Sequence, residues 1–285
     1  MRSRLICLIY SVCMVLSGMA ADTLRVLVIG NSFSVDAVEQ ELWPLAHHSG
    51  MELCIGSLYR GGCSLREHAV GLQRGDSLYS YRLIADGRRR VRDSVTLREA
   101  LHERRWDIVT LQQVSDLSGV TDSLAPWLTI LIDSIRVAQP AARLAWHRTW
   151  AYDVGARHPG FARYANDQRT MDDSIARCTA HLLEAYPIDL LIPVGEAVQR
   201  ARRRARGGCL TRDGYHLRYD YGRYLAACVW FEALTGVRPR SGRYDVPWYG
   251  SQYEPEPRSA RAMRQVRTAA TQRRCRRDAH RAVKK

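Results

Sequence analysis

The chain has 285 residues, of which 46% are hydrophobic, and it carries a formal net charge of +14. This length and apolar content suffice for one well-packed domain, or for one domain with appendages. Much of the charge lies at the end, since residues 253–285 contain eleven Arg or Lys and three Asp or Glu. A solvated face or a disordered tail explains such a cluster, so no specific nucleic-acid partner is expected. Contact with an anionic surface or polymer is the alternative for this tail.

The first twenty residues have the pattern of a secretory signal peptide. Arg2 and Arg4 form a basic start, residues 5–16 are apolar, and small residues precede a cleavage point after Ala20. The apolar run is too short to span a bilayer comfortably, which disfavours an uncleaved anchor. We therefore expect residues 1–20 to be removed and the mature protein to be secreted or periplasmic.

Six cysteines remain after this segment, at positions 54, 63, 178, 209, 228 and 275. They show no metal-ligand spacing, so we expect neither a metal nor a cofactor. Export permits disulfides, but the spacing does not assign them. Cys63 and Cys209 each lie beside a candidate site motif and can form a pair; buried free thiols are the alternative.

Five short apolar runs rich in β-branched or aromatic residues are expected to form buried strands. They are residues 25–29, 53–59, 107–113, 143–150 and 189–194. Helical patterns separate them at residues 36–49, 64–72, 123–138, 161–186 and 217–235. This alternation predicts an α/β fold, a three-layer α/β/α sandwich around a parallel sheet. In such sheets the functional site lies at the carboxyl ends of the strands.

Two segments depart from this alternation of strands and helices. Residues 78–95 alternate around the turn signal Asp86-Gly87, which predicts a β-hairpin inserted after the second helix and shaping one wall of a cleft. From Ser241 the chain becomes rich in Pro, Gly and aromatic residues, and then in Arg. We expect one domain over residues 21–250, followed by a basic tail at 251–285 that is disordered or marginally helical.

Two short motifs carry the chemistry. Ser32 follows the first predicted strand in the turn Gly30-Asn31-Ser32, and Asp213-Gly214-Tyr215-His216 precedes the last predicted helix. A serine hydroxyl needs an adjacent base to become a nucleophile. His216 can take that proton while Asp213 holds the other ring nitrogen, since three residues in a turn let the carboxylate reach back. The structural alternatives are a helix-capping serine, a capping Asp and a surface His.

An acyl-transfer site also needs hydrogen-bond donors for the developing oxyanion. The Ser32 amide is one candidate, and the Gly62 amide follows the second strand in Gly61-Gly62; the alternative there is a plain turn before a helix. Gln112 or Gln113, at the end of the third strand, can supply a side-chain donor or can be structural.

Aromatic and polar residues at the same sheet edge are candidates for substrate binding. They are Asn31, His147, Trp150 and Tyr152. A flat aromatic face suits the C–H groups of a sugar ring. The alternative is a core position for Trp150 and a buried, hydrogen-bonded His147.

The chain resembles the SGNH (GDSL-like) hydrolase superfamily, and more closely a little-characterised bacterial branch whose first block reads Gly-Asn-Ser-Phe-Ser. The resemblance covers residues 25–235. It implies a flavodoxin-like, five-stranded parallel sheet, with Ser32 as nucleophile, a Gly62 amide in the oxyanion hole, and Asp213 and His216 completing the triad. Asn31 replaces the usual Asp. The third block reads Leu111-Gln112-Gln113-Val114-Ser115 in place of Gly-x-Asn-Asp, so Gln113 is assigned the role of the missing Asn.

The sequence therefore predicts a secreted serine esterase that hydrolyses short acyl esters, acetyl above all, on carbohydrate through an acyl-enzyme. The expected partner is a small-molecule or polysaccharide ester. The substrate class rests on the family analogy and on export. Two alternatives are a non-catalytic carbohydrate-binding or cell-surface protein that retains the fold, and a binder of anionic polymers through residues 202–206 and the tail.

Overall fold

The computed structural model describes residues 23–204, 210–246 and 268–285. The expected signal peptide at 1–20 and the candidate disulfide partner Cys209 lie outside these ranges.

Within the described ranges, seven strands form one sheet in the spatial order β4-β3-β2-β1-β5-β6-β7. The strands are β1 (Leu24–Gly30), β2 (Leu53–Tyr59), β3 (Tyr79–Ala85), β4 (Arg88–Val95), β5 (Ile108–Leu111), β6 (Arg143–His147) and β7 (Leu190–Ile192). Strands β2, β1, β5, β6 and β7 pair in parallel. Strands β3 and β4 are antiparallel and join the sheet at β2. The sheet expected to hold five parallel strands is thus a mixed sheet, because the hairpin of β3 and β4 pairs with the edge that β2 would otherwise leave open.

Helices fill the connections between the strands. They are α1 (Ser32–Ser34), a π-helical turn (Val35–Glu39), α2 (Leu42–His48), α3 (Leu65–Arg74), α4 (Leu97–His102), α5 (Trp127–Ala138), α6 (Gln168–Ala185), α7 (Val194–Arg204), α8 (Gly222–Thr235) and α10 (Ala269–Val283). Short 3₁₀ turns span Ser115–Leu117, Thr121–Ser123 and Pro159–Tyr164. The single helix expected over 161–186 is divided, because Ala165 and Asn166 adopt positive φ and Asp167 then caps α6.

The start of α3 shows how local sequence fixes an element beside the site. Ser64 Oγ accepts a hydrogen bond from the Glu67 amide, and the Glu67 carboxylate accepts one from the Ser64 amide. This capping box satisfies two amides that the first helical turn leaves without partners. A Ser followed three residues later by a Glu is the sequence signature of this box, and the box sets where the preceding Gly61-Gly62 loop ends.

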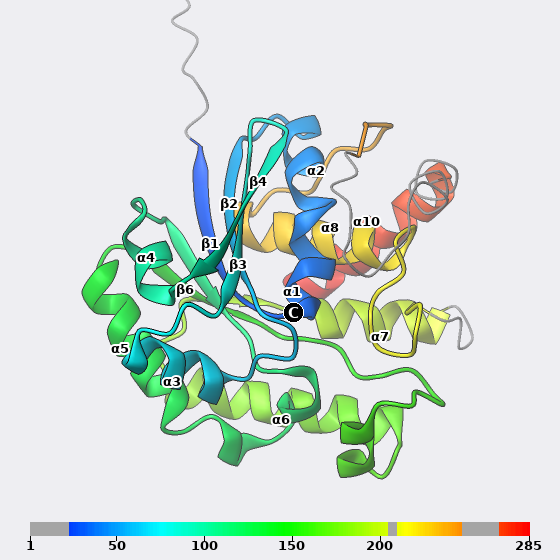
Figure 1. The fold of residues 1–285 in the computed structure, drawn as a ribbon. Helices are drawn as coiled ribbons and strands as arrows, with labels where there is room; N and C mark the ends of the chain where they lie inside the picture. The colour runs from blue at the N-terminus through cyan, green and yellow to red at the C-terminus, as the bar shows by residue number, and fades with distance from the viewer. Residues whose placement is uncertain (1–22, 205–209, 247–267) are drawn as a thin grey trace, which may run out of the picture.

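The sheet is covered on both faces (Figure 1): α2, α7, α8 and α10 lie on one side, and α3, α4 and α5 on the other. Val26 and Val28 of β1 point into the first core, whereas Leu27 and Ile29 point into the second. Successive strand residues face opposite sides of a sheet, so a strand buried on both faces reads as a continuous apolar run.

Counted alone, the parallel strands follow the order 2-1-3-4-5 of flavodoxin-like sheets. In that order β1 lies between β2 and β5, at the point where the strand order reverses. The crevice at the carboxyl end of β1 is where such folds place their ligands. Ser32 stands in this crevice, two residues after β1 ends at Gly30.

The C-terminal segment departs from expectation. Helix α10 packs against α8 and α7, and its Cys275 and Ala279 side chains are fully buried. His280 Nδ1 lies 2.5 Å from Glu232 Oε1 of α8, and Arg204 pairs with Asp278. The expectation of a disordered or marginally helical tail is therefore wrong for residues 268–285, where α10 packs on the domain; residues 247–267 lie outside the described ranges.

Helix α10 can pack on the domain because it carries a narrow stripe of small side chains. Cys275, Ala279 and Ala282 recur at helical spacing on one side of α10 and are buried. The opposite side exposes arginines at positions 273, 274, 277 and 281. Contact of this surface with an anionic partner stays a prediction.

Replacing Ala279 with Arg should lower the free energy of unfolding by more than about 2 kcal/mol, because the guanidinium would lose its hydration in a packed interface. Urea denaturation followed by circular dichroism measures the change. Arg277→Ala, at an exposed position of the same helix, is the matched control and should stay within about 0.5 kcal/mol of wild type. A wild-type midpoint for Ala279→Arg would mean that α10 does not pack on the domain.

Candidate active site

The nucleophile turn, residues 30–32 with Ser32 as the candidate nucleophile, lies where β1 passes into α1. Asn31 is the N-cap of α1, and its Oδ1 accepts the Phe33 amide at 3.1 Å. Ser32 is therefore the first residue of the helix, with its side chain partly exposed. A Cβ at Gly30 would lie 2.4 Å from Ser34 Oγ. Glycine is needed there because Ser34 approaches the backbone closely.

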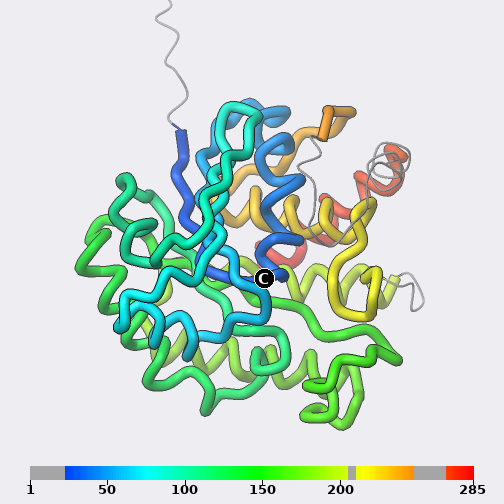
Figure 2. The backbone as a smooth tube through the Cα atoms, viewed as in Figure 1, coloured from blue at the N-terminus to red at the C-terminus, as the bar shows by residue number. Residues whose placement is uncertain are grey.

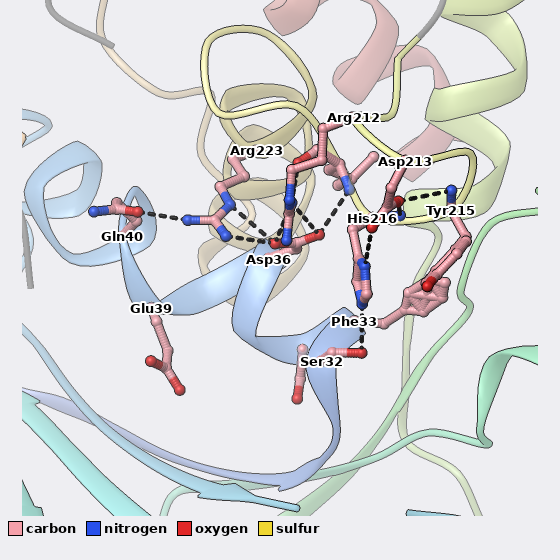
Figure 3. Close-up of polar contacts among 12 residues, drawn as sticks. Ser32, Phe33, Asp36, Glu39, Gln40, Arg212, Asp213, Tyr215, His216 and Arg223 are labelled. Carbon is pink, nitrogen blue, oxygen red and sulfur yellow. Dashed lines mark hydrogen bonds and ion pairs between the residues drawn. The ribbon is translucent and has the colours of Figure 1, made fainter. Parts of the chain in front are cut away.

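Ser32, His216 and Asp213 form an unbroken hydrogen-bonded chain (Figure 3). His216 Nε2 lies 2.9 Å from Ser32 Oγ, and His216 Nδ1 lies 2.6 Å from Asp213 Oδ2. The two motifs are 184 residues apart in sequence and meet at the edge of the sheet. The first ring nitrogen can take the hydroxyl proton, while the carboxylate fixes the tautomer through the second.

The Asp213 carboxylate is itself held by its own turn. Asp213 Oδ1 accepts the His216 amide at 2.7 Å and the Tyr215 amide at 3.1 Å, which leaves Oδ2 for the imidazole. Burial alone would raise the pKa of Asp213, but the hydrogen bonds from the His216 ring and amide outweigh it and lower the pKa to about 2. The carboxylate is therefore ionised at neutral pH and can stabilise an imidazolium.

A buried carboxylate, Asp36, ties the loop of His216 to the helix of Ser32. Its Oδ2 accepts the Leu217 amide at 2.6 Å, and Arg212 Nη1 lies 3.1 Å from its Oδ1. Arg223 of α8 donates to the same carboxylate through Nε and Nη2, at 3.0 and 2.6 Å. Figure 3 shows both guanidinium groups converging on Asp36. Sequence reasoning missed this residue, because an Asp in a helical pattern gives no signal of partners 176 to 187 residues away.

Asn31 links the nucleophile turn to two neighbouring segments. Its Nδ2 donates to the Cys63 carbonyl at 3.0 Å, and its Oδ1 also accepts from Gln112 Nε2 at 2.7 Å. Gln112 Oε1 in turn lies 2.8 Å from His147 Nδ1. Asn31 thus uses a donor and an acceptor at once, which an ionised Asp cannot do. It holds the loop of Gly62 against the turn of Ser32.

The structure does not support Gln113 as an oxyanion donor. Its Oε1 accepts the amides of Leu65 and Val114, and its Nε2 donates to Ser123 Oγ at 3.0 Å. The hydrogen bonds of the Gln113 side-chain amide therefore anchor the start of α3, and they leave no donor for a site at Ser32. Gly62, by contrast, is exposed, adopts a φ of +62° and lines the same cavity as Ser32. Backbone amides of Ser32 and Gly62 remain as the candidate donors.

Three of the four expected substrate-binding residues lie beneath the site instead of in it. Trp150 and Tyr152 are fully buried, and His147 is 1% exposed. Trp150 Nε1 donates to the Tyr215 carbonyl at 2.7 Å, and its ring meets Phe33 edge-on with centroids 4.3 Å apart. These side chains support the loops that carry the motifs; the core alternative for Trp150 and His147 is the one observed. Asn31 lines the cavity but is 2% exposed.

A cavity of about 980 Å³ opens beside Ser32 and His216. One wall comes from the hairpin, through Ser80 and Arg82 of β3 and Arg89, Val91 and Asp93 of β4. Other lining residues are Asn31, Asp36, Glu39, Gln40, Tyr59, Gly62, Ser115, His158, Arg212, Asp213, Tyr215, Tyr219 and Arg223. The arginines of this lining were not foreseen. Alternation along residues 78–95 predicted the hairpin, and the face that carries Arg82 and Arg89 is the one that meets the cavity.

The cysteines of the described segments are buried free thiols at positions 54, 63, 178, 228 and 275. Burial raises the pKa of Cys63, next to Gly62, to about 12, so this thiol is no nucleophile at neutral pH. Over the same segments, no group of three or more His, Cys, Asp or Glu is placed to hold a metal ion. No helix in them has the length and apolar character needed to cross a bilayer.

Comparison with known protein families identifies the family to which the chain belongs. The model of a domain of unknown function, DUF4886, matches residues 25–273. A crystal structure of a DUF4886 family protein from Bacteroides uniformis is 36% identical, with a TM-score of 0.79, over 92% of this chain and 95% of the other. The chain therefore belongs to the DUF4886 family. Among functionally curated proteins, no match was found.

Two more distant structures share the fold. A candidate SGNH hydrolase from Slackia heliotrinireducens is 22% identical, with a TM-score of 0.51, over 75% of this chain and 100% of the other. A candidate GDSL-like lipase from Parabacteroides merdae is 14% identical, with a TM-score of 0.50, over 74% and 95%. At these identities the likeness concerns the fold.

Below pH 6.5 the buried His147 should make the protein less stable. Burial lowers its pKa to about 3, whereas in the unfolded chain it titrates near 6.5. Between these values the unfolded state binds the proton and the native state does not, so stability falls as pH falls, by up to about 1.4 kcal/mol per pH unit. Urea unfolding at pH 6 and pH 5 should show a smaller loss in His147→Gln than in wild type. His181→Gln, at an exposed position of α6, should keep the wild-type loss; equal losses in all three proteins would contradict the assignment.

Proposed function

We propose that this member of the DUF4886 family is a serine hydrolase of carboxylic esters. The observation that carries the proposal is the Asp213–His216–Ser32 chain, with contacts of 2.6 and 2.9 Å, opening onto a cavity of about 980 Å³. A capping serine and a surface histidine need not meet, and an ionised carboxylate on the second ring nitrogen holds the tautomer in which His216 Nε2 can act as a general base.

In the proposed reaction, Ser32 Oγ attacks the ester carbonyl as His216 Nε2 takes its proton. Asp213 stabilises the imidazolium, and the amides of Ser32 and Gly62 donate to the oxyanion. Collapse of the tetrahedral intermediate breaks the bond to the alcohol, which leaves with the proton from His216. Water then gives a proton to His216 and attacks the acyl-enzyme. The acid is released and Ser32 regains its proton.

The proposed substrate is a short acyl ester, acetyl above all, on a carbohydrate. The support is a roomy cavity, lined by polar and apolar surface, in which Tyr215 and His158 offer ring faces near His216. Their ring centroids lie 5.1 Å apart, and Tyr215 is the residue directly before the proposed base. This pair takes the place of Trp150 and Tyr152, which are buried. Acetate release from a panel of acetylated polysaccharides is the direct test.

We further propose that the protein acts outside the cytoplasm. The support is the basic and then apolar pattern of residues 1–20, which ends in small residues. N-terminal sequencing of the protein recovered from its native cells should begin at Ala21. A mature chain that retains residues 1–20 would overturn this part of the proposal.

Ser32→Ala should reduce the turnover of a small acetyl ester by about a thousandfold or more, because no nucleophile would remain at His216 Nε2. The native thermal midpoint should be kept, since the Ser32 side chain is small and partly exposed. Mass spectrometry should also show one serine-directed phosphonate on the wild type and none on the variant. Ser80→Ala, in the same cavity wall, is the control and should react like wild type.

Asp213→Asn tests the orientation of His216 separately from the attack by Ser32. The amide should favour the wrong imidazole tautomer and lower turnover severely, while Ser32 stays in place. Full activity in either variant would transfer the chemistry to another residue. An unlabelled and inactive wild type would favour the non-catalytic binding protein instead.

A further inference from the structure

His158 presents a hydrogen-bond donor to the cavity, and its contacts fix which ring nitrogen carries the hydrogen. Nδ1 of His158 accepts the Gly160 amide at 3.1 Å. A backbone amide can only donate, so Nδ1 is the nitrogen without hydrogen and Nε2 is the one that carries it. His158 is partly exposed and lines the cavity beside Ser32, and within the described ranges its Nε2 has no hydrogen-bond partner. This N–H is therefore open to a ligand.

The segment around His158 is held in place by its neighbours. Pro159 restricts His158 to an extended backbone, which is observed with φ of −74° and ψ of 127°. A Cβ at Gly160 would overlap the Asp116 Cβ, so only glycine lets the chain approach the loop after β5 this closely. The Phe161 side chain is fully buried in the core. A donor on such a support loses little entropy when a ligand binds.

The Tyr215 ring connects His158 to the proposed base. The His158 and Tyr215 centroids lie 5.1 Å apart at an interplanar angle of 79°, and the Tyr215 and His216 centroids lie 4.5 Å apart. The Tyr215 backbone is held on both sides, since its amide donates to Asp213 and its carbonyl accepts from Trp150 Nε1. The cavity wall therefore offers an aromatic ring next to the base and an N–H donor next to that ring.

Two segments far apart in the sequence make this part of the wall. Figure 2 shows the chain after β6, in green, passing beside the yellow segment that carries Asp213 and His216. The Asp153 amide donates to the Gly214 carbonyl at 2.7 Å and so joins the two segments. The segment of His158 and the turn of the proposed base are therefore positioned together.

The formal charges of the acids and arginines in the described lining balance. Four carboxylates accompany four guanidinium groups, namely Asp36, Glu39, Asp93 and Asp213 with Arg82, Arg89, Arg212 and Arg223. A charged ligand would lose hydration on entry without a net opposite charge to replace it. The lining therefore favours a neutral ligand. The hydroxyl and ring oxygens of a neutral sugar fit this requirement, because they can accept a hydrogen bond from the His158 N–H.

We propose, building on the hydrolase function above, that His158 is a substrate-binding residue for an acylated neutral sugar. Its Nε2–H donates to a hydroxyl or ring oxygen of the sugar, while the Tyr215 ring packs against the C–H groups and the acyl group lies at Ser32. His158 thus distinguishes a sugar ester from a simple ester of the same acid. It binds the substrate and takes no part in the proton transfer between Ser32 and His216.

The variant His158→Asn separates this binding role from the structural role of the same side chain. The Asn Oδ1 can still accept the Gly160 amide, but the shorter side chain leaves no donor where Nε2 stood. We expect KM for an acetylated methyl glucoside to rise about five- to tenfold, as the loss of one hydrogen bond requires, with kcat little changed. The kcat/KM for 4-nitrophenyl acetate, which has no sugar, should stay within about twofold of wild type.

The matched control is Arg157→Asn, at the exposed residue directly before His158 and outside the cavity lining. It should leave the kinetics of both esters at their wild-type values. An unchanged KM for the sugar ester in His158→Asn, or an equal loss on both esters, would overturn the proposal.

Nuclear magnetic resonance tests the donor without hydrolysis. In Ser32→Ala, long-range nitrogen–proton correlation should show the ring hydrogen of His158 on Nε2. Methyl glucoside should shift this resonance and leave that of His181, which is exposed on α6, unchanged. A hydrogen on Nδ1, or no shift with the sugar, would overturn the proposal. Tighter binding of methyl glucuronoside than of methyl glucoside would overturn the neutral-substrate assignment.

These outcomes separate the sugar contact from the hydrolase itself. Hydrolysis of both esters with an unchanged KM in His158→Asn would leave the hydrolase standing and reject the sugar contact. A shift of the His158 resonance by methyl glucoside, without hydrolysis of either ester by wild type, would reject the hydrolase and retain the sugar contact.

Discussion

The carboxylate of Asp36 is the interaction on which the proposed active site depends. It is 1% exposed and accepts hydrogen bonds from Arg212, Arg223 and the Leu217 amide. These bonds join the helix after Ser32 to the loop of Asp213 and His216 and to the start of α8. A buried charge is tolerated only when such partners replace its hydration. The same contacts that permit its burial therefore fix the Ser32–His216 contact at 2.9 Å.

A second hydrogen-bond network, centred on Asn31, positions the nucleophile turn. Asn31 connects the Cys63 carbonyl, the Phe33 amide and Gln112, and Gln112 reaches the neutral, buried His147. Its members come from the ends of β1, β5 and β6 and from the loop after β2. Adjacent parallel strands end at one edge, so their first loop residues can interlock there. Ser32 thus sits on a support made of several segments, which favours a fixed geometry for the oxyanion donors.

The hairpin has two roles that share one structural cause. By pairing with β2 it covers an edge strand, and by this pairing it turns Arg82 and Arg89 toward Glu39. Helix α10 likewise extends the domain at the far end of the chain, through Cys275 and Ala279 packed on α7 and α8. The DUF4886 match to residues 25–273 includes the hairpin and enters α10. The hairpin therefore belongs within the family's domain, whereas the match ends in the first turn of α10.

The sequence by itself determined the local elements and the order of the motifs. The doubly buried runs of β1 and β2, the capping box at Ser64 and the hairpin turn at Asp86-Gly87 are short-range patterns, and they are read within a few residues. The positions of Ser32, Asp213 and His216 followed from strand ends and a turn spacing in the same way. Only the tertiary structure decided which side chains fill the space between them. Gln113 turned out to anchor α3, Trp150 and Tyr152 lie in the core, and the arginines of the hairpin and of α8 meet Glu39 and Asp36 across 43 to 187 residues. The reason is that burial and ion pairing depend on which faces the whole fold brings together, and no local period of the chain records them.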